Sequence, residues 1–132
     1  MKRIEQALLY GIVDTGYVAD DRVAEVARRL ADGGVDILQL RAKDREEEEI
    51  QRLAERVVVV TEAAGIPLIL NDHPELVPAV GAQGAHVGQD DLPVADARWR
   101  AGRALAGEVP APLIGKSTHG LVQAIAAEAE GA

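Results

Sequence analysis

The chain has 132 residues, almost half of them hydrophobic, so it can fold into one domain with a hydrophobic core rather than stay disordered. Its formal net charge of −8 at pH 7 argues against sequence-independent binding to nucleic acid or to an anionic membrane, since both depend on clustered Lys and Arg. Because it lacks cysteine, a signal-peptide pattern and any apolar run of about 20 residues, we expect a cytoplasmic protein without disulfides or thiolate metal sites.

Short apolar runs typical of strands alternate with longer runs typical of helices, and Gly, Pro, Asn or Asp lies at the joints. The predicted strands are residues 8–13, 35–41, 66–70, 84–87 and 113–116. The predicted helices are residues 21–31, 45–64, 74–80, 94–105 and 119–130. Strands that alternate with helices in this way indicate a parallel sheet with right-handed crossovers.

The length of each unit indicates the kind of sheet. At about 25 residues per unit, eight units would need about 200 residues, near the lower end for a (β/α)₈ barrel. We therefore expect an α/β fold of the parallel TIM-barrel type, here an incomplete barrel of about five βα units. An open doubly wound sheet is the alternative, and both folds bind ligands at the carboxyl ends of their strands.

Polar residues gather where each predicted strand gives way to the next helix. They are Asp14, Gln39, Arg41, Lys43, Asn71, Asp72, Gln89, Asp90, Asp91, Ser117 and His119. The turns at the opposite ends of the strands, residues 31–34 and 63–65, consist of glycine and alanine apart from Asp32. The sequence therefore predicts a single ligand-binding edge.

The second predicted strand ends in QLRAK, in which period-2 alternation sends Gln39, Arg41 and Lys43 to one face and their apolar neighbours to the other. Two cations on one face require an anion, because an unpaired buried charge is expensive. One interpretation is a pyrophosphate whose remaining charge is bridged by Mg²⁺ between Asp72 and Asp91. The other is a structural network in which the two cations pair with those aspartates.

Several candidate residues have a structural and a functional interpretation. Asn71, Asp72 and Asp91 could cap helices, but two loops that each offer a carboxylate at one edge favour Mg²⁺. Ser117 fits either a helix N-cap or a phosphate site. His86 is either a core imidazole or a contact to a heteroaromatic substrate. We interpret His73 as a loop or cap residue, and the acidic run 46–49 as the solvated first turn of a helix capped by Asp44.

The phrases LLYGIVD, GGVDILQLRAK, IPLILND, VGAQGAHVGQDDLP and IGKSTHG occur in this order, and together they resemble thiamine-phosphate synthase, a (β/α)₈-barrel family of thiamine biosynthesis. The resemblance implies a transferase that joins hydroxymethylpyrimidine pyrophosphate to hydroxyethylthiazole phosphate and releases pyrophosphate. It implies electrostatic and Mg²⁺ catalysis rather than covalent catalysis.

The resemblance also implies roles for individual residues. The matching positions near the pyrimidine pyrophosphate are Gln39, Arg41, Lys43, Asn71 and Ser117, of which Arg41, Lys43 and Ser117 are the predicted catalytic residues. Asp72 and Asp91 match the two Mg²⁺ ligands. Their position at the same edge makes His86 and His119 further candidate substrate contacts.

The family pattern continues beyond the segment that ends at Ala132. We therefore expect residues 1–132 to be the N-terminal portion of such a barrel, without strands six to eight and the thiazole phosphate site, and inactive alone. Unpaired edge strands predict self-association as a homo-oligomer or by strand exchange. The alternatives are a thiazole tautomerase in which His119 moves protons, and a pyrimidine-pyrophosphate binder without catalysis.

Overall fold

The computed structural model describes residue 1, residues 3–102 and residues 110–132, which contain one five-stranded sheet. Its strands are β1 (Tyr10–Asp14), β2 (Ile37–Arg41), β3 (Leu68–Asn71), β4 (Gly84–Val87) and β5 (Leu113–Lys116). All neighbouring strands are parallel, and their order in space is their order along the chain. Because a doubly wound sheet reverses its order at a switch point, this order identifies an open, barrel-type arrangement.

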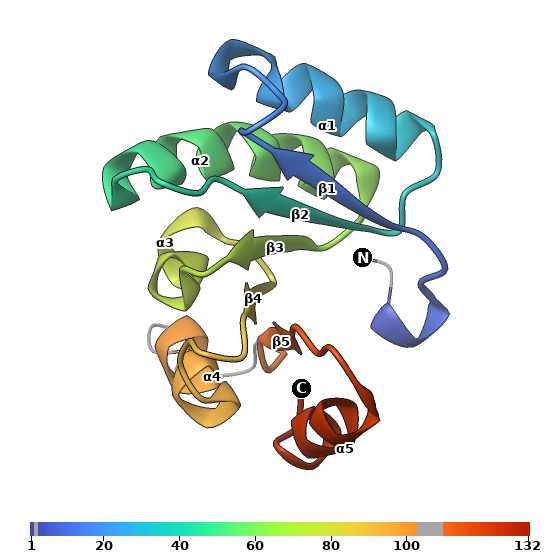
Figure 1. Ribbon diagram of the computed structural model, residues 1–132. Helices are drawn as coiled ribbons and strands as arrows, with labels where there is room; N and C mark the ends of the chain where they lie inside the picture. Colours follow the sequence, from blue (N-terminus) through green and yellow to red (C-terminus); the bar gives the residue numbers. More distant parts are fainter. Residues whose placement is uncertain (2, 103–109) are drawn as a thin grey trace.

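Each strand is followed by the α-helix of the same number. The helices are α1 (Val23–Asp32), α2 (Glu47–Ala64), α3 (Val77–Val80), α4 (Val94–Gly102) and α5 (Leu121–Ala129), with short 3₁₀ helices η1 (Ile4–Gln6), η2 (Asp20–Arg22) and η3 (Pro74–Leu76). Figure 1 shows α1 to α5 following one another around one side of the twisted sheet. None of the helices in the described segments is long and apolar enough to cross a bilayer.

The face of the sheet that the helices cover forms the core. Its alternating strand residues are at most 5% exposed, and they are Val13, Leu38, Leu40, Leu68, Leu70, Ala85, Val87 and Ile114. Helix α2 contributes most of the helical side of this core, through Leu53, Val57 and their neighbours. The predicted alternation in β2 is confirmed, since Leu38 and Leu40 belong to the core on this face, whereas Gln39 and Arg41 bond to Tyr10 and Asp14 on the other face.

The opposite face of the sheet is partly open. Tyr10 and Ile12, on the edge strand β1, are 44% and 52% exposed. A cavity of about 350 Å³ lies farther along this face, where Tyr10, Ile69, His86 and Gly115 are among the residues that line it. The strand ends that carry the candidate site therefore border a face that the helices do not cover.

The predicted bounds of β4 and β5 are confirmed, whereas β1 and β2 begin two residues later than predicted. For β1 the cause is Asp36, whose Oδ2 accepts hydrogen bonds from the amides of Leu8 and Leu9 at 2.6 and 2.9 Å. Those amides therefore do not enter a strand ladder. Strand β3 also begins two residues late, after Pro67, which has no amide hydrogen to donate.

The helix starts also differ from the prediction. Asp44 does not cap α2, because it lies in a turn with φ of 58°, and the helix starts at Glu47 after Glu46, whose amide donates to Glu49 Oε2 at 3.2 Å. Residues 20–22 form η2 instead of the first turn of α1. Helix α5 starts at Leu121 rather than at residue 119, and α4 is described as far as Gly102, so the predicted residues 103–105 lie outside the described residues.

Candidate functional site

The sheet register aligns the predicted site residues at the carboxyl ends of the strands. Asp14 pairs with Arg41 across β1 and β2, and Asn71 pairs with His86 across β3 and β4. His86 in turn pairs with Gly115 on β5. Period-2 alternation then directs these side chains toward the open face of the sheet.

Gln39 is the most buried of the predicted site residues, with 4% exposure. Its Nε2 donates a hydrogen bond to the Tyr10 hydroxyl at 2.9 Å. Burial raises the pKa of Tyr10, and the hydrogen bond from Gln39 offsets part of that increase. The sequence reasoning missed Tyr10, although its place in the first strand two register positions from Gln39 is a signal that could have found it.

Arg41 pairs with Asp14, and this corrects the predicted network in which Arg41 pairs with Asp72 or Asp91. Arg41 Nη1 lies 2.7 Å from Asp14 Oδ2, and the other oxygen, Oδ1, accepts the Gly16 amide at 2.8 Å. The hydrogen bond from the Gly16 amide lowers the pKa of Asp14, and the Arg41 guanidinium lowers it further. Desolvation of the carboxylate acts in the opposite direction and raises the pKa. Nη1 of Arg41 is thus bonded to Asp14, while the other guanidinium nitrogens offer further hydrogen-bond donors.

Lys43 Nζ lies 3.9 Å from Asp72 Oδ2, with side-chain exposures of 52% and 31%. Asp72 adopts φ of 65°, and its amide donates to the His86 carbonyl at 2.9 Å. Asp72 therefore faces its neighbours at the strand ends and is not the N-cap of η3, which is His73. This pair is the part of the predicted cation and carboxylate arrangement that the structure brings together.

Asp91 lies in the loop after β4, at the same end of the sheet as Arg41, and is exposed. Its Oδ2 accepts the Gly88 amide at 2.6 Å, so it closes its own loop rather than capping α4. Together with the carboxylate of Asp72, in the loop after the neighbouring strand β3, the second oxygen of Asp91 offers a set of oxygen donors. Such a set suits Mg²⁺, which prefers carboxylates, waters and phosphate oxygens.

His86 and Ser117 are joined directly, with His86 Nε2 at 2.8 Å from Ser117 Oγ. Burial lowers the pKa of His86, and the charge of Asp72 opposes that decrease. Gln89 Nε2 donates to the Ser117 carbonyl at 2.5 Å, a contact that the sequence reasoning did not predict. Ser117 is not a helix cap, because α5 is preceded by Gly120.

Asn71 and His119 complete the predicted set. Asn71 is partly buried at the end of β3, beside His86 in the register. His119 is exposed, and its backbone amide donates to Gln123 Oε1 at 2.8 Å. The geometry therefore gathers Asn71 with His86 and Ser117, and leaves His119 at the outer rim.

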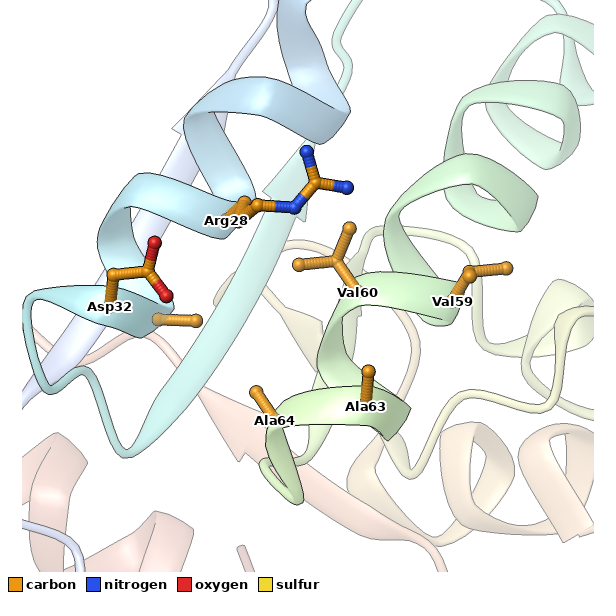
Figure 2. Close-up of a pocket in the computed structure, with 7 residues that line it drawn as sticks. Arg28, Asp32, Val59, Val60, Ala63 and Ala64 are labelled. Atoms are coloured by element: carbon orange, nitrogen blue, oxygen red, sulfur yellow. The ribbon is translucent and has the colours of Figure 1, made fainter.

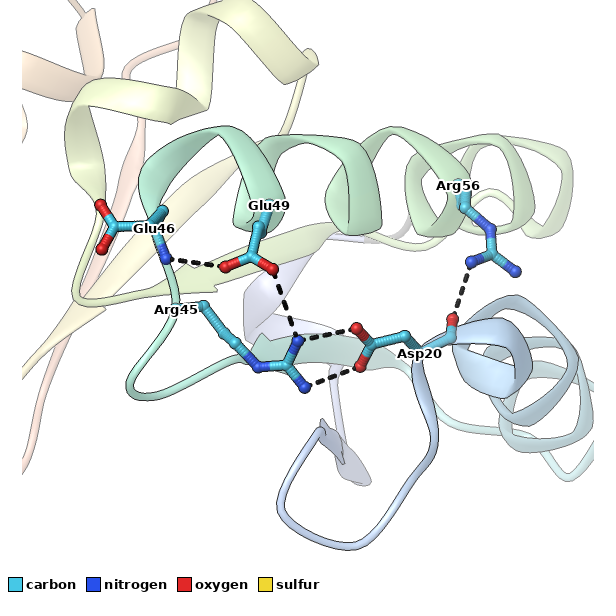
Figure 3. Close-up of polar contacts among 5 residues, drawn as sticks. All are labelled: Asp20, Arg45, Glu46, Glu49 and Arg56. Atoms are coloured by element: carbon cyan, nitrogen blue, oxygen red, sulfur yellow. Dashed lines mark hydrogen bonds and ion pairs between the residues drawn. The ribbon is translucent and has the colours of Figure 1, made fainter.

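The loop that carries Lys43 is held by a cluster that the sequence reasoning missed, which Figure 3 shows. Arg45 binds both carboxylate oxygens of Asp20, at 2.7 and 2.9 Å, and lies 3.9 Å from Glu49. Arg56 donates to the Asp20 carbonyl at 2.7 Å. We name this cluster the Arg45 clamp. Planar bidentate pairing fixes orientation as well as distance, so the clamp joins the loop after β2 to η2.

A second group of potential metal ligands lies beside the β3 loop. One oxygen or nitrogen atom from each of Glu47, His73 and Glu75 lies within 4.8 Å of the other two. His73 Nδ1 is 2.8 Å from Glu75 Oε1, which supplies a structural partner for the imidazole. The prediction that the acidic run 46–49 is a solvated first turn is confirmed for its three exposed residues, Glu46, Glu47 and Glu48, whereas Glu49 is partly buried and belongs to the Arg45 clamp.

Residues 9–132 match the family model described as thiamine monophosphate synthase. A thiamine-phosphate synthase from Shouchella clausii is 40% identical over 124 residues, which are 94% of this chain and 56% of that protein. A thiamine-phosphate synthase from Caldanaerobacter subterraneus is 38% identical over 132 residues, 100% of this chain and 58% of that protein. The solved thiamine phosphate pyrophosphorylase from Pyrococcus furiosus superposes with a TM-score of 0.74 at 26% identity, covering 94% of this chain and 56% of that one.

These matches confirm the predicted fold class and the predicted family. The chain spans somewhat more than half the length of the curated relatives it matches. The family model covers nearly all of the chain, and the sequential parallel sheet agrees with the structural neighbour. This chain belongs to the thiamine monophosphate synthase family.

Proposed function

We propose that this chain carries the half-site for hydroxymethylpyrimidine pyrophosphate of a cytoplasmic, Mg²⁺-dependent thiamine-phosphate synthase. The observation that carries the proposal is the carboxyl-terminal edge of the sheet, where Arg41 pairs with Asp14, Lys43 lies 3.9 Å from Asp72, and Asp91 lies in the loop after the neighbouring strand β4. Cations alone would suit many anions, but cations beside two carboxylates suit an anion that brings a divalent ion. Family membership supports the same ligand.

In the proposed reaction, the bond between the pyrimidine methylene carbon and the pyrophosphate oxygen breaks, and the oxygen keeps the electron pair. The thiazole nitrogen then forms a bond to that carbon. Arg41 and Lys43 stabilise the charge that grows on the departing pyrophosphate, and Gln39 and Asn71 orient the pyrimidine. Asp72 and Asp91 would hold Mg²⁺, which neutralises pyrophosphate charge when bound.

Calorimetric titration of the 132-residue chain with inorganic pyrophosphate tests the proposal. We expect binding with Mg²⁺ and much weaker binding when Mg²⁺ is replaced by a chelator. Asp72→Asn should abolish the Mg²⁺ effect, because Asn keeps the shape and tolerates the left-handed backbone of Asp72. Equal binding with and without Mg²⁺ would contradict the proposed metal ligands.

Product analysis separates the alternatives. Pyrophosphate release from the two substrates identifies a synthase. It can be assayed in one of the longer thiamine-phosphate synthases that this chain matches, with Asp72→Asn made at the matching position. Proton exchange on the thiazole that depends on His119 would identify a tautomerase instead. Binding of the pyrimidine pyrophosphate without release of pyrophosphate would identify a binding protein without catalysis. The paired carboxylates favour the synthase.

We also propose that the 132-residue chain self-associates. Strands β1 and β5 are the two edges of the sheet, and an unpaired edge can accept a strand from another molecule. Exposed apolar side chains on α5, namely Leu121, Val122 and Ile125, add to this tendency. Sedimentation that shows only monomer across a wide range of concentrations would refute it.

A further inference from the structure

The contact between His86 and Ser117 has a direction, and the direction decides what Ser117 can do. The backbone of Ser117 is fixed on both sides, because its amide donates to the Val87 carbonyl at 2.9 Å and its carbonyl accepts from Gln89. Only the side-chain hydroxyl of Ser117 can still rotate between alternative hydrogen-bond partners. A hydroxyl has a single proton, and it can give that proton either to His86 or to a ligand.

We infer that His86 is a positioning residue that donates from Nε2–H to Ser117 Oγ and thereby directs the Ser117 proton toward the pyrophosphate. The inference rests on the proposed function for the identity of the anion. The oxygens of Mg²⁺-bound pyrophosphate are chiefly hydrogen-bond acceptors, so we expect Ser117 to be the donor. His86 Nε2 can then only be a donor to the same oxygen.

Gly115 supplies an independent reason for this tautomer. A Cβ at Gly115 would lie 2.5 Å from His86 Nδ1, so the Gly115 hydrogen in that direction points at the ring nitrogen. A bare Nδ1 lone pair accommodates a Cα–H group, whereas an Nδ1–H group would meet it hydrogen to hydrogen. Nδ1 has no hydrogen-bond partner among the described residues, and the Nδ1–H tautomer would leave a half-buried donor unpaired.

The tautomer can be measured on the free chain. Long-range ¹H–¹⁵N correlation spectra distinguish Nε2–H from Nδ1–H, and the chain has only three histidines, so loss of one signal in His86→Gln assigns it. We expect the Nε2–H tautomer for His86 at neutral pH. A neutral Nδ1–H ring would overturn the inference, whether or not the chain binds pyrophosphate.

Binding of Mg²⁺-pyrophosphate supplies the second readout. His86→Ala and Ser117→Ala should each weaken binding about tenfold, the loss expected for one hydrogen bond to a charged group. The double variant should lose no more than either single one, since both remove the same bond. His86→Gln should recover most of the affinity, because it retains an amide donor, and Gly115→Ala should behave as His86→Ala by displacing the ring.

Gln83→Ala is the matched control. Gln83 precedes β4 at its other end, where its side chain accepts from the Leu68 amide at 2.8 Å and donates to the Gly81 carbonyl at 2.9 Å. This variant also loses side-chain hydrogen bonds, but binding should be unchanged. Multiplied losses in the double variant, or wild-type binding by His86→Ala, would overturn the inference. Failure of the wild-type chain to bind pyrophosphate would instead contradict the proposed function, and the tautomer would still decide the role of His86.

Discussion

The two ends of this sheet use polar side chains differently. At the carboxyl ends of the strands, charged groups keep unused capacity, since Arg41 gives one nitrogen to Asp14 and Lys43 stands 3.9 Å from its partner. At the amino ends, polar groups satisfy the backbone: Asp36 accepts two amides, and Gln83 makes two bonds to the main chain. One end keeps charged groups with spare hydrogen-bonding capacity, and the other uses its polar groups to bond the main chain.

A packing region between α1 and α2 shows the same difference from the candidate site. At their carboxyl ends, near the amino ends of the strands, α1 and α2 border a cavity of about 310 Å³. Figure 2 shows Arg28 and Asp32 on α1 facing the valine and alanine side chains of α2. This region has one residue of each charge and mostly small apolar side chains, so we assign it to packing. Charged residues alone therefore do not distinguish the candidate site from this packing region, whereas charged residues with unused donors and acceptors do.

The largest effect that would test this comparison is expected at Arg41. Arg41→Gln should weaken Mg²⁺-pyrophosphate binding about 100-fold, because a charged fork that can make two bonds to phosphate is lost. The free energy of unfolding should change by less than about 1 kcal/mol, as for other partly exposed ion pairs. Calorimetry and urea unfolding measure the two quantities. A large loss of stability with unchanged binding would reverse the comparison.

The opposite pattern is expected at Asp36, which is 6% exposed. Asp36→Ala leaves the Leu8 and Leu9 amides without their acceptor and should cost about 2 kcal/mol of unfolding free energy. Asp36→Asn keeps an acceptor oxygen and should cost less. Pyrophosphate affinity should be unchanged in both, provided that it is measured well below the unfolding temperature. An affinity loss would mean that the two ends are coupled.

A smaller effect is expected in the cavity between α1 and α2. Val60 is 8% exposed there, whereas its neighbour Val59 is 64% exposed. Val60→Ala should cost about 1 kcal/mol of unfolding free energy by removing buried methyl groups, and Val59→Ala less than about 0.5 kcal/mol. Neither variant should alter binding. Equal losses at the two positions would show that this cavity is not a packing region.

The smallest effect concerns acid stability. The pKa of Asp14 is lowered in the fold by the Gly16 amide and then by Arg41, so its contribution to stability is present above its unfolded pKa of about 3.9. That contribution is lost as the pH falls through the lower folded pKa. Asp14→Asn should therefore flatten the stability curve below about pH 4. Urea unfolding at a series of acidic pH values measures this change. If the free energy of unfolding of Asp14→Asn depends on pH as steeply as that of the wild type, this assignment is contradicted.

The sequence predicted the five βα units and the edge that carries the candidate site, because hydrophobic periodicity and strand-end polarity are local signals. It did not predict which residues pair across neighbouring strands. Asp14 and Tyr10 were missed as partners of Arg41 and Gln39, since period-2 alternation gives the face of a residue but not its cross-strand neighbour. The late start of β1 was missed for the same reason: the responsible carboxylate, Asp36, lies 27 residues from the Leu9 amide.

The Arg45 clamp affects how fast a ligand can be captured. Because two hydrogen bonds from Arg45 to the Asp20 carboxylate already hold the loop after β2, we expect little further ordering of that loop when an anion arrives. The association rate constant should then follow ionic strength, as for a rigid, electrostatically guided encounter. Arg45→Ala would replace this behaviour with a slower, loop-limited capture that depends far less on salt.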